Sequence, residues 1–493
     1  MSDAYVVSSA LSFSWPDETP VFDRLSFTVP GGRTGLVAPN GSGKSTLLRL
    51  IAAELTPTSG SVTVNGTLGH LPQTLPLSTG LTVAEVLGVA GVIAAIDAVE
   101  RGEVDEEHFT TIGEDWDIEE RTRAELDRLG LGRLTLDQGL ESLSGGQIVT
   151  LGLAAQLLAR PDVLLLDEPT NNLDLEARHR LHGVVDDWRG CLLVVSHDRA
   201  LLDRMDRIAE LERGELRYYG GNFAAYEEAV SAEREVAEKN VRHAEAELKR
   251  EKREMQQARE RAERRSSNAA RNIKNAGLPK ILAGARQRKA QESAGRAGNT
   301  HADRVGEARA RLDEAGRAVR DDTRLVLDLP GTEVPAGRTL FEAKGLRLRG
   351  LFAGEGVDRL DLLDPALSVA ENLAAFAPTM PEADRMNLLA RFLFRGQGAH
   401  LKAGDLSGGE LLRATLACVL SAEPAPHLLL LDEPTNNLDL VSVGQLESAL
   451  TSYRGAFLVV SHDDRFLAEI GVTRYLRLAE GELREVAAPA AGE

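Results

Sequence analysis

The segment LLLDEPTNNLDL occurs twice in this chain, at Leu164–Leu175 and again at Leu429–Leu440. An LSGG segment precedes each copy and an LVVSHD segment follows each one, so that three motifs recur in the same order. Asp167 and Asp432 are 265 residues apart, a period far too long for a solenoid repeat. The sequence therefore contains a duplicated domain, and a chain of 493 residues has room for two copies and a connecting segment.

The composition is that of a globular protein without membrane segments. Hydrophobic residues make up 43% of the chain and charged residues 27%, and no apolar run approaches the ~20 residues that a spanning helix needs. No basic segment followed by an apolar core stands at the N-terminus, so we expect no secretory signal and a cytoplasmic location. The two cysteines, Cys191 and Cys418, have apolar neighbours typical of buried thiols, which favours neither a disulfide nor a metal site.

The segment PNGSGKST occurs only once, at Pro39–Thr46. An apolar strand, TGLVA, precedes it and a helix, TLLRLIAAEL, follows it, which is the setting of a phosphate-binding P-loop. Backbone N–H groups of such a loop surround the phosphates of a nucleotide, while Lys44 contacts the β and γ oxygens and Ser45 holds Mg²⁺. Ala38 replaces the first glycine of the motif, which can shift the entry turn. The predicted nucleotide-binding residues are Asn40, Gly41, Ser42, Gly43, Lys44, Ser45 and Thr46.

The apolar run VLLLDE ends in Asp167 and Glu168, as expected of a buried parallel strand that delivers carboxylates to one edge of its sheet. Asp167 is predicted to bind Mg²⁺, and Glu168 to polarise the attacking water. The VVSH segment likewise ends an apolar run, and His197 is predicted to lie beside the γ-phosphate. The structural alternatives are that the two acids cap the following turn and that His197 is an ordinary core residue.

The LSGGQ segment exposes a hydroxyl group and backbone N–H groups at the start of a predicted helix, where the positive end of the helix dipole suits a phosphate. Together with the other motifs it resembles the signature of the ATP-binding cassette (ABC) superfamily. The resemblance implies that the signature of one cassette closes on nucleotide held by the P-loop of the other. We therefore expect an α/β fold with two P-loop NTPase cassettes, of which the second is incomplete.

A charged segment separates the two copies. Residues 226–325 are rich in Ala, Glu, Lys, Arg and Gln, with acidic and basic residues at helical spacing, and predict a long helical hairpin. The first cassette then spans residues 1–225 and the second spans residues 326–493. The formal net charge is −19, yet Ser231–Arg320 carries 23 Lys and Arg against 14 Asp and Glu. Acids are absent around the predicted tip, which suits contact with a polyanion.

Two cassettes without a membrane domain, the NNLD segment after each Glu and the charged hairpin between the cassettes resemble the ABC-F family. The resemblance implies ATP and Mg²⁺ as cofactors and binding to the ribosome at the tRNA exit site. A hairpin tip near Arg271–Lys289 would contact rRNA and tRNA, and the protein would act as a translation factor or protect ribosomes from antibiotics. By position, Gln73 matches the family's Q-loop, a ligand of Mg²⁺, and Trp15 would stack on adenine unless it is a core residue. The resemblance favours no DNA and no membrane partner, and a monomer whose cassettes pair within one chain.

The second copy is shorter than the first. Phe22 and Val83 are 61 residues apart, whereas the corresponding Phe341 and Val369 are only 28 apart, a shortfall of 33. The missing segment would hold the central strand, the P-loop, its helix and the Q-loop glutamine, near whose place Asp358 stands. The two copies also differ at Thr150 and Arg413, which occupy similar places after the signature.

One composite site can therefore be complete and the other cannot. The complete site combines Lys44, Ser45, Gln73, Asp167, Glu168 and His197 with Ser407, Gly408 and Gly409 of the second signature. The second site would pair Ser144, Gly145 and Gly146 with a P-loop that is missing, so that Asp432, Glu433 and His462 have no Mg–ATP to act on.

Two interpretations of the short copy stay open, a natural degenerate cassette and an internal deletion. The alternatives in function are a nucleotide-binding protein with impaired turnover, the ATPase subunit of a transporter, and a DNA-maintenance ATPase. The hairpin has no role in a transporter subunit. The chain also lacks the very long coiled coils and the Cys-rich zinc modules of the DNA-maintenance class.

Overall fold

The computed structural model describes residues 4–73, 80–212, 214–275, 303–316, 332–334, 362–436, 438–479 and 482–487. The chain divides into two compact units, one made of Met1–Tyr226 with Arg324–Glu493 and the other of Glu227–Thr323. The first unit holds both copies of the repeat, and the second holds the charged segment. Among the helices that the structure describes, none is long and apolar enough to cross a membrane.

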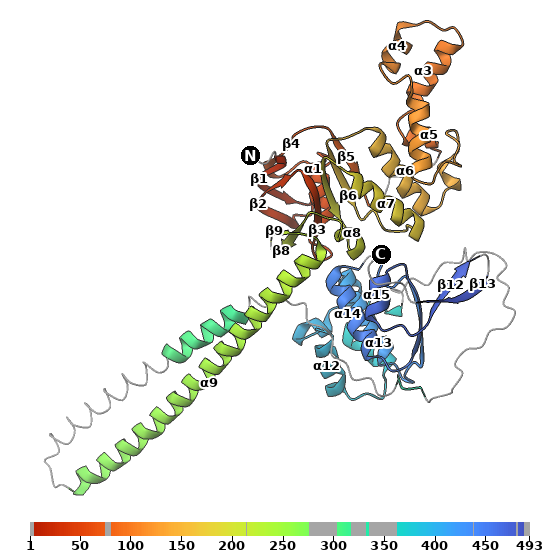
Figure 1. Cartoon of the computed structure of the whole chain (residues 1–493). Coiled ribbons are helices and arrows are strands. Elements are labelled where there is room, and N and C mark those ends of the chain that lie inside the picture. Colours follow the sequence, from red (N-terminus) through yellow and green to blue (C-terminus); the bar gives the residue numbers. More distant parts are fainter. Residues whose placement is uncertain are drawn as a thin grey trace. The chain divides into compact units, whose positions relative to one another are not determined.

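A six-stranded sheet with the order β5-β6-β7-β3-β8-β9 forms the centre of the first cassette (Figure 1). Its strands β5, β6, β7, β3 and β8 run parallel, and β9 returns antiparallel to β8. The sequence predictions of the strand before the P-loop and of the two strands before Glu168 and His197 are confirmed. The strands are β3 (Gly32–Val37), β5 (Leu68–Leu71), β6 (Val163–Asp167), β7 (Cys191–Val195), β8 (Arg207–Glu212) and β9 (Glu215–Gly220).

Both faces of this sheet are buried, and alternate side chains of each strand enter different cores. Leu164 and Leu166 pack with residues of α6 and α7, whereas Val163 and Leu165 pack with residues of α1 and of an antiparallel sheet. That second sheet has the order β2-β1-β4, with β1 (Ala4–Ser14), β2 (Pro20–Pro30) and β4 (Ser59–Val64). The helices are α1 (Lys44–Ile51), α2 (Val83–Val86), α3 (Ala90–Glu100), α4 (Glu106–Ile112), α5 (Ile118–Arg128), α6 (Gly145–Leu158), α7 (Leu175–Asp187) and α8 (Arg199–Leu202).

The second unit is built on one long helix, α9 (Phe223–Asn275), which begins in the first unit. Ion pairs at i,i+4 spacing run along it, among them Arg234–Glu238 and Arg250–Glu254, and such pairs stabilise exposed helices. Residues 303–316 form a second, shorter helix, and Arg311 pairs with Glu247 of α9 at 2.7 Å. The predicted tip near Arg271–Lys289 falls largely outside the described residues, which stop at Asn275 on this side.

The second cassette has the same signature helix and the same two strands before its acids and its histidine, but its sheet is split. In the first cassette, β3 lies between β7 and β8 and joins them. The described residues of the second cassette form two separate pairs, a parallel one of β10 with β11 and an antiparallel one of β12 with β13. The split falls where the strand that the sequence lacks would stand. The elements are α11 (Val369–Phe376), α12 (Glu382–Arg391), α13 (Gly408–Leu420), β10 (Leu428–Asp432), α14 (Leu440–Ser452), β11 (Ala456–Val460), α15 (Asp464–Glu469), β12 (Tyr475–Ala479) and β13 (Glu482–Val486).

One face of the parallel pair β10 and β11 is exposed. Leu165 and Leu193 are at most 2% exposed in the first cassette, whereas their counterparts Leu430 and Leu458 are 71% and 52% exposed. The other face keeps its core, where Leu429 packs with residues of α13 and α14. Among the described residues, the second cassette thus keeps the helical layer on one face of its sheet and shows no apolar layer on the other.

Candidate functional site

The P-loop connects β3 to α1 through two glycines with positive φ. Gly41 has φ of 79° and Gly43 has φ of 93°, a conformation that costs other residues strain energy. A Cβ atom on Gly43 would also lie 2.6 Å from Val21 Cγ1 and 2.9 Å from Phe22 Cζ. The glycines of PNGSGKST are therefore required by the turn itself, which opens directly into α1.

Lys44 begins α1 and is 8% exposed. Its Nζ donates hydrogen bonds to the carbonyl oxygens of Ala38 at 2.8 Å and Pro39 at 3.3 Å. Burial lowers the pKa of Lys44, and the charge of nearby Glu168 opposes that effect. Ala38, which replaces the first glycine of the motif, thus accepts the shorter of these two hydrogen bonds from the lysine ammonium group.

A cavity of about 470 Å³ lies in front of the P-loop. It brings together most of the residues that the sequence singled out, from five separate stretches of the chain. Val21 and Asn171 also line it and were not predicted. The lining residues are Trp15, Val21, Asn40, Gly41, Gly43, Lys44, Ser45, Thr46, Gln73, Asp167, Glu168, Asn171 and His197. Four of the residues predicted to bind the nucleotide do not line this cavity, namely Ser42, Ser407, Gly408 and Gly409.

Glu168 and His197 stand at the ends of adjacent parallel strands. His197 Nε2 lies 3.2 Å from Glu168 Oε1, and the backbone N–H of His197 donates to Glu168 Oε2 at 3.3 Å. Burial raises the pKa of Glu168 to about 8 and lowers the pKa of His197 to about 3. At neutral pH the histidine is therefore uncharged, and the carboxyl group titrates close to the physiological range, as suits a general base.

The backbone of Glu168 is held in the left-handed region, with φ of 48°. This conformation costs a non-glycine residue about 1–3 kcal/mol and is concentrated at functional sites. A backbone hydrogen bond from Glu168 N–H to Val195 O at 2.8 Å, across to the end of β7, helps to hold it. The turn directs the carboxyl group of Glu168 toward the cavity instead of along the strand.

Asp167 and Ser45 form a polar pair at the same edge. Burial raises the pKa of Asp167, and a hydrogen bond with the Ser45 side chain opposes the shift. Its Oδ1 atom is buried and has no hydrogen-bond partner. An unsatisfied carboxylate oxygen beside a hydroxyl group is a donor set that fits Mg²⁺, which prefers oxygen ligands.

Trp15 follows β1 at the start of the turn that leads to β2, and it is half-buried. Its ring packs edge-to-face on Phe13, with centroids 5.2 Å apart, and lines the cavity. Trp15 therefore packs against the core and also borders the cavity, so its position fits both a core residue and an aromatic partner for adenine. This placement leaves it available to stack on a base.

The second cassette contributes one contact to the P-loop that the sequence did not single out. The backbone N–H of Asn40 donates to Asp439 Oδ2 at 2.8 Å, and Asp439 also accepts from Ser442 N–H at the start of α14. Asp439 is the last acid of the repeated NNLD segment, so the repetition was the available signal. By contrast, Ser407 Oγ is hydrogen-bonded to Glu410 Oε2 at 2.6 Å within its own helix.

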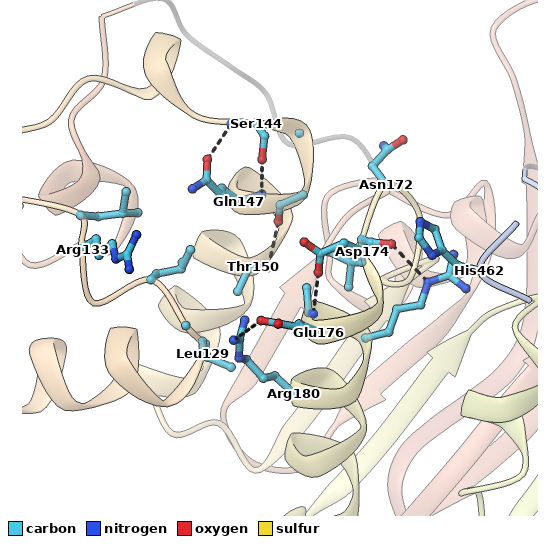
Figure 2. Close-up of a pocket in the computed structure, with 18 of the residues that line it drawn as sticks. Leu129, Arg133, Ser144, Gln147, Thr150, Asn172, Asp174, Glu176, Arg180 and His462 are labelled. Carbon is cyan, nitrogen blue, oxygen red and sulfur yellow. Dashed lines mark hydrogen bonds and ion pairs between the residues drawn. The ribbon is translucent and has the colours of Figure 1, made fainter. Parts of the chain in front are cut away.

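A second cavity, of about 920 Å³, lies in front of the first signature (Figure 2). Ser144 caps α6 there in a reciprocal arrangement with Gln147, and Glu433 and His462 line the cavity from the second cassette. The only PNGSGKST segment of the chain belongs to the other cavity. Glu433 and His462, the counterparts of Glu168 and His197, therefore line a cavity with the first signature, whereas the P-loop lines the other cavity.

The sequence family described as "ABC transporter" matches residues 22–171. The chain is 32% identical to the tylosin resistance ATP-binding protein TlrC of Streptomyces fradiae, over 94% of this chain and 96% of that protein. It is 31% identical to the energy-dependent translational throttle protein EttA of Mycobacterium tuberculosis, over 90% of this chain and 86% of that protein. The probable ATP-binding protein YheS of Escherichia coli is 30% identical over 92% of this chain and 76% of its own length. With these relatives and the geometry of the P-loop cavity, the chain belongs to the ABC-F family of ATP-binding cassette ATPases.

Proposed function

We propose that this protein hydrolyses ATP at the single complete site of its first cassette and uses ATP-driven closure of its cassettes to act on the ribosome. The observation that carries the proposal is the cavity in which the P-loop, Asp167, Glu168 and His197 converge. Two relatives of nearly full length are named for tylosin resistance and for translational throttling. These names support a role in translation or in protection against a ribosome-targeting antibiotic.

The roles of the site residues follow from their chemistry. Lys44 and the backbone N–H groups of the P-loop, Asn40 to Thr46, bind the phosphates, and Trp15 stacks on the adenine ring. Ser45, Asp167 and Gln73 would hold Mg²⁺, which would supply neutralisation of the charge on the transferred phosphate. Glu168 accepts a proton from the attacking water, and neutral His197 donates a hydrogen bond to the γ-phosphate.

Closure requires the second cassette even though that cassette lacks a P-loop. Asp439 already contacts the P-loop through Asn40, which supports pairing of the two cassettes within one chain. On closure we expect Ser407, Gly408 and Gly409 to approach the nucleotide. The hydrogen bond between Ser407 and Glu410 would have to open for the serine hydroxyl group to reach a phosphate.

The hairpin supplies the proposed contact with RNA. Acids on α9 are paired with basic residues one turn away, as in Arg242–Glu238, so the stem carries little excess charge. The segment Arg271–Lys289 has no acidic residue in an otherwise acidic chain. Such a segment binds the phosphates of rRNA and tRNA through counterion release. The proposal places the protein in the cytoplasm, as a monomer that binds ribosomes.

The test is co-sedimentation of the Glu168→Gln variant with purified 70S ribosomes, with and without ATP, beside a circular-dichroism melt of each sample. We expect pelleting that depends on ATP, because the variant binds ATP and does not release it by hydrolysis. Adding Lys44→Ala in the same chain should abolish the ATP dependence. A folded Glu168→Gln variant that stays in the supernatant under both conditions would contradict the ribosomal role. ATP binding by the unchanged protein without phosphate release would instead indicate a nucleotide-binding protein with impaired turnover.

A further inference from the structure

We propose that Glu447 of the second cassette is a positioning residue for ATP hydrolysis in the first, acting through Arg199 on the segment that carries His197. The inference rests on the proposed function, because it assigns a role at the same ATP site. It concerns two residues outside the P-loop cavity, which neither the motifs nor the cavity lining had singled out.

Glu447 and Arg199 form a bidentate, buried ion pair between the cassettes. Arg199 Nη1 lies 2.7 Å from Glu447 Oε1, and Nη2 lies 3.4 Å from Oε2. The two side chains are 9% and 14% exposed. A bidentate pair of a guanidinium and a carboxylate fixes the orientation of both groups as well as the distance between them. It therefore constrains the two cassettes more tightly than a surface ion pair would.

Each partner of this pair is close in the chain to a residue of the ATP site. Arg199 is the first residue of α8 and follows His197 by two positions, with the α8 cap Asp198 between them. Glu447 lies on α14, whose cap Asp439 accepts the backbone N–H of Asn40 in the P-loop. The single helix α14 thus contacts both the loop that binds phosphate and the segment that places the histidine.

The internal duplication provides a comparison within the same chain. At the 265-residue offset, Asp464 corresponds to Arg199 and His182 corresponds to Glu447. Burial lowers the pKa of His182, which leaves it uncharged at neutral pH, and no ion pair joins these two described residues. The buried pair is present on the side of the complete site and is replaced on the side of the incomplete one.

The surroundings of Arg199 explain why its partner matters. Burial raises the pKa of both Glu447 and Asp463, and the charge of Arg199 lowers each of them. Arg199 is therefore a cation shared by acids of the second cassette. Reversal of Glu447 would place two buried cations side by side, displacing α8 and with it the histidine, since like charges at short range repel strongly in a buried setting.

The test is a charge-reversal cycle in the full chain, with Glu447→Arg, Arg199→Glu and the double variant. We expect each single reversal to lower kcat by roughly 10–100-fold, the scale of a small misplacement of a catalytic group. ATP affinity, measured in a Glu168→Gln background, should stay close to that of the matched chain without the reversal. The double variant should regain most of the lost kcat because it restores an ion pair.

The matched control reverses Arg123 and Glu119, an exposed i,i+4 pair at 2.8 Å on the same cassette, and should leave kcat unchanged. Should the reversal variants fail to fold in a circular-dichroism melt, Glu447→Gln decides, with an expected loss of kcat at unchanged ATP affinity. Equal kcat for the unchanged chain and the folded variants would overturn the positioning role, and so would additive losses in the double variant. Absence of turnover in the unchanged chain would instead overturn the proposed function.

Discussion

His197 Nε2 lies 3.2 Å from Glu168 Oε1, and the corresponding atoms of His462 and Glu433 lie 3.5 Å apart. Glu433 also keeps the left-handed backbone, with φ of 42°. The second copy thus preserves the local geometry of a catalytic pair. Its histidine is 42% exposed, however, against 11% for His197, because no P-loop covers it.

This relationship gives a paired mutational prediction. Glu168→Gln should lower kcat for ATP hydrolysis by about 10²–10⁴-fold, the usual contribution of a positioned general base. Glu433→Gln, the same change at the corresponding position, should leave kcat unchanged. Phosphate release under saturating Mg–ATP measures both. Comparable losses in the two variants would show that the second cassette takes part in the chemistry.

The pH dependence follows from the environment of Glu168. Its pKa is raised to about 8 by burial, and a general base acts only when it has lost its proton. The ratio kcat/KM should therefore rise with pH from 6 toward 8 and level off above that, because this ratio reports ionisation in the free enzyme. His197, with a pKa of about 3, stays neutral throughout this range. A flat profile between pH 6 and 8 would contradict the assignment of Glu168 as the base.

Trp15 offers a test of the adenine site. Trp15→Ala should raise the Kd for ATP by about 5–150-fold, which corresponds to the ~1–3 kcal/mol typical of stacking between a base and an aromatic ring. Trp15→Phe should keep most of the affinity, because the phenyl ring can still stack. Titration of a fluorescent ATP analogue measures this, and Trp116→Ala, at a 51% exposed tryptophan outside the cavity lining, is the control. Equal losses in Trp15→Ala and Trp15→Phe would assign Trp15 to the core alone.

The exposed face of the second sheet predicts that the same Leu→Ala change lowers stability by different amounts at equivalent positions of the two cassettes. Leu165→Ala should destabilise the protein by about 2–5 kcal/mol, because Leu165 is fully buried. Leu430→Ala should change stability by less than about 0.5 kcal/mol, because Leu430 is 71% exposed. Urea titrations followed by circular dichroism compare the two. A large loss for Leu430→Ala would mean that some part of the molecule covers this face in solution.

Sequence patterns predicted those parts of the fold and the site that depend on residues close together in the chain. The strand–loop–helix context predicted that a helix begins near Lys44, and all-apolar runs predicted that Asp167 and His197 lie at one edge of the sheet, as the structure has them. The missing strand was also predictable, because a count of residues between matching motifs locates it. These features need only the chain's own periodicity and the rule that parallel strands end together.

Contacts between cassettes could not be predicted in the same way. The bond from Asn40 to Asp439 and the pair of Arg199 with Glu447 join residues 399 and 248 positions apart. No periodicity encodes such distances, because they depend on how one folded surface meets another. Trp15 shows the same limit on a smaller scale, since its neighbours were needed to show that it borders both the core and the cavity.

The split sheet also affects how quickly proteases degrade the protein in a cell. Among the described strands of the second cassette, each is hydrogen-bonded to a single neighbouring strand, whereas β7 of the first cassette has β6 and β3 on its two sides. Local opening starts where backbone hydrogen bonds and apolar contacts are fewest. Proteases that cleave transiently opened segments should therefore cut near β11 and β12 before they reach the first cassette. The rate at which the whole chain is degraded would then be set by the copy that lacks the PNGSGKST segment.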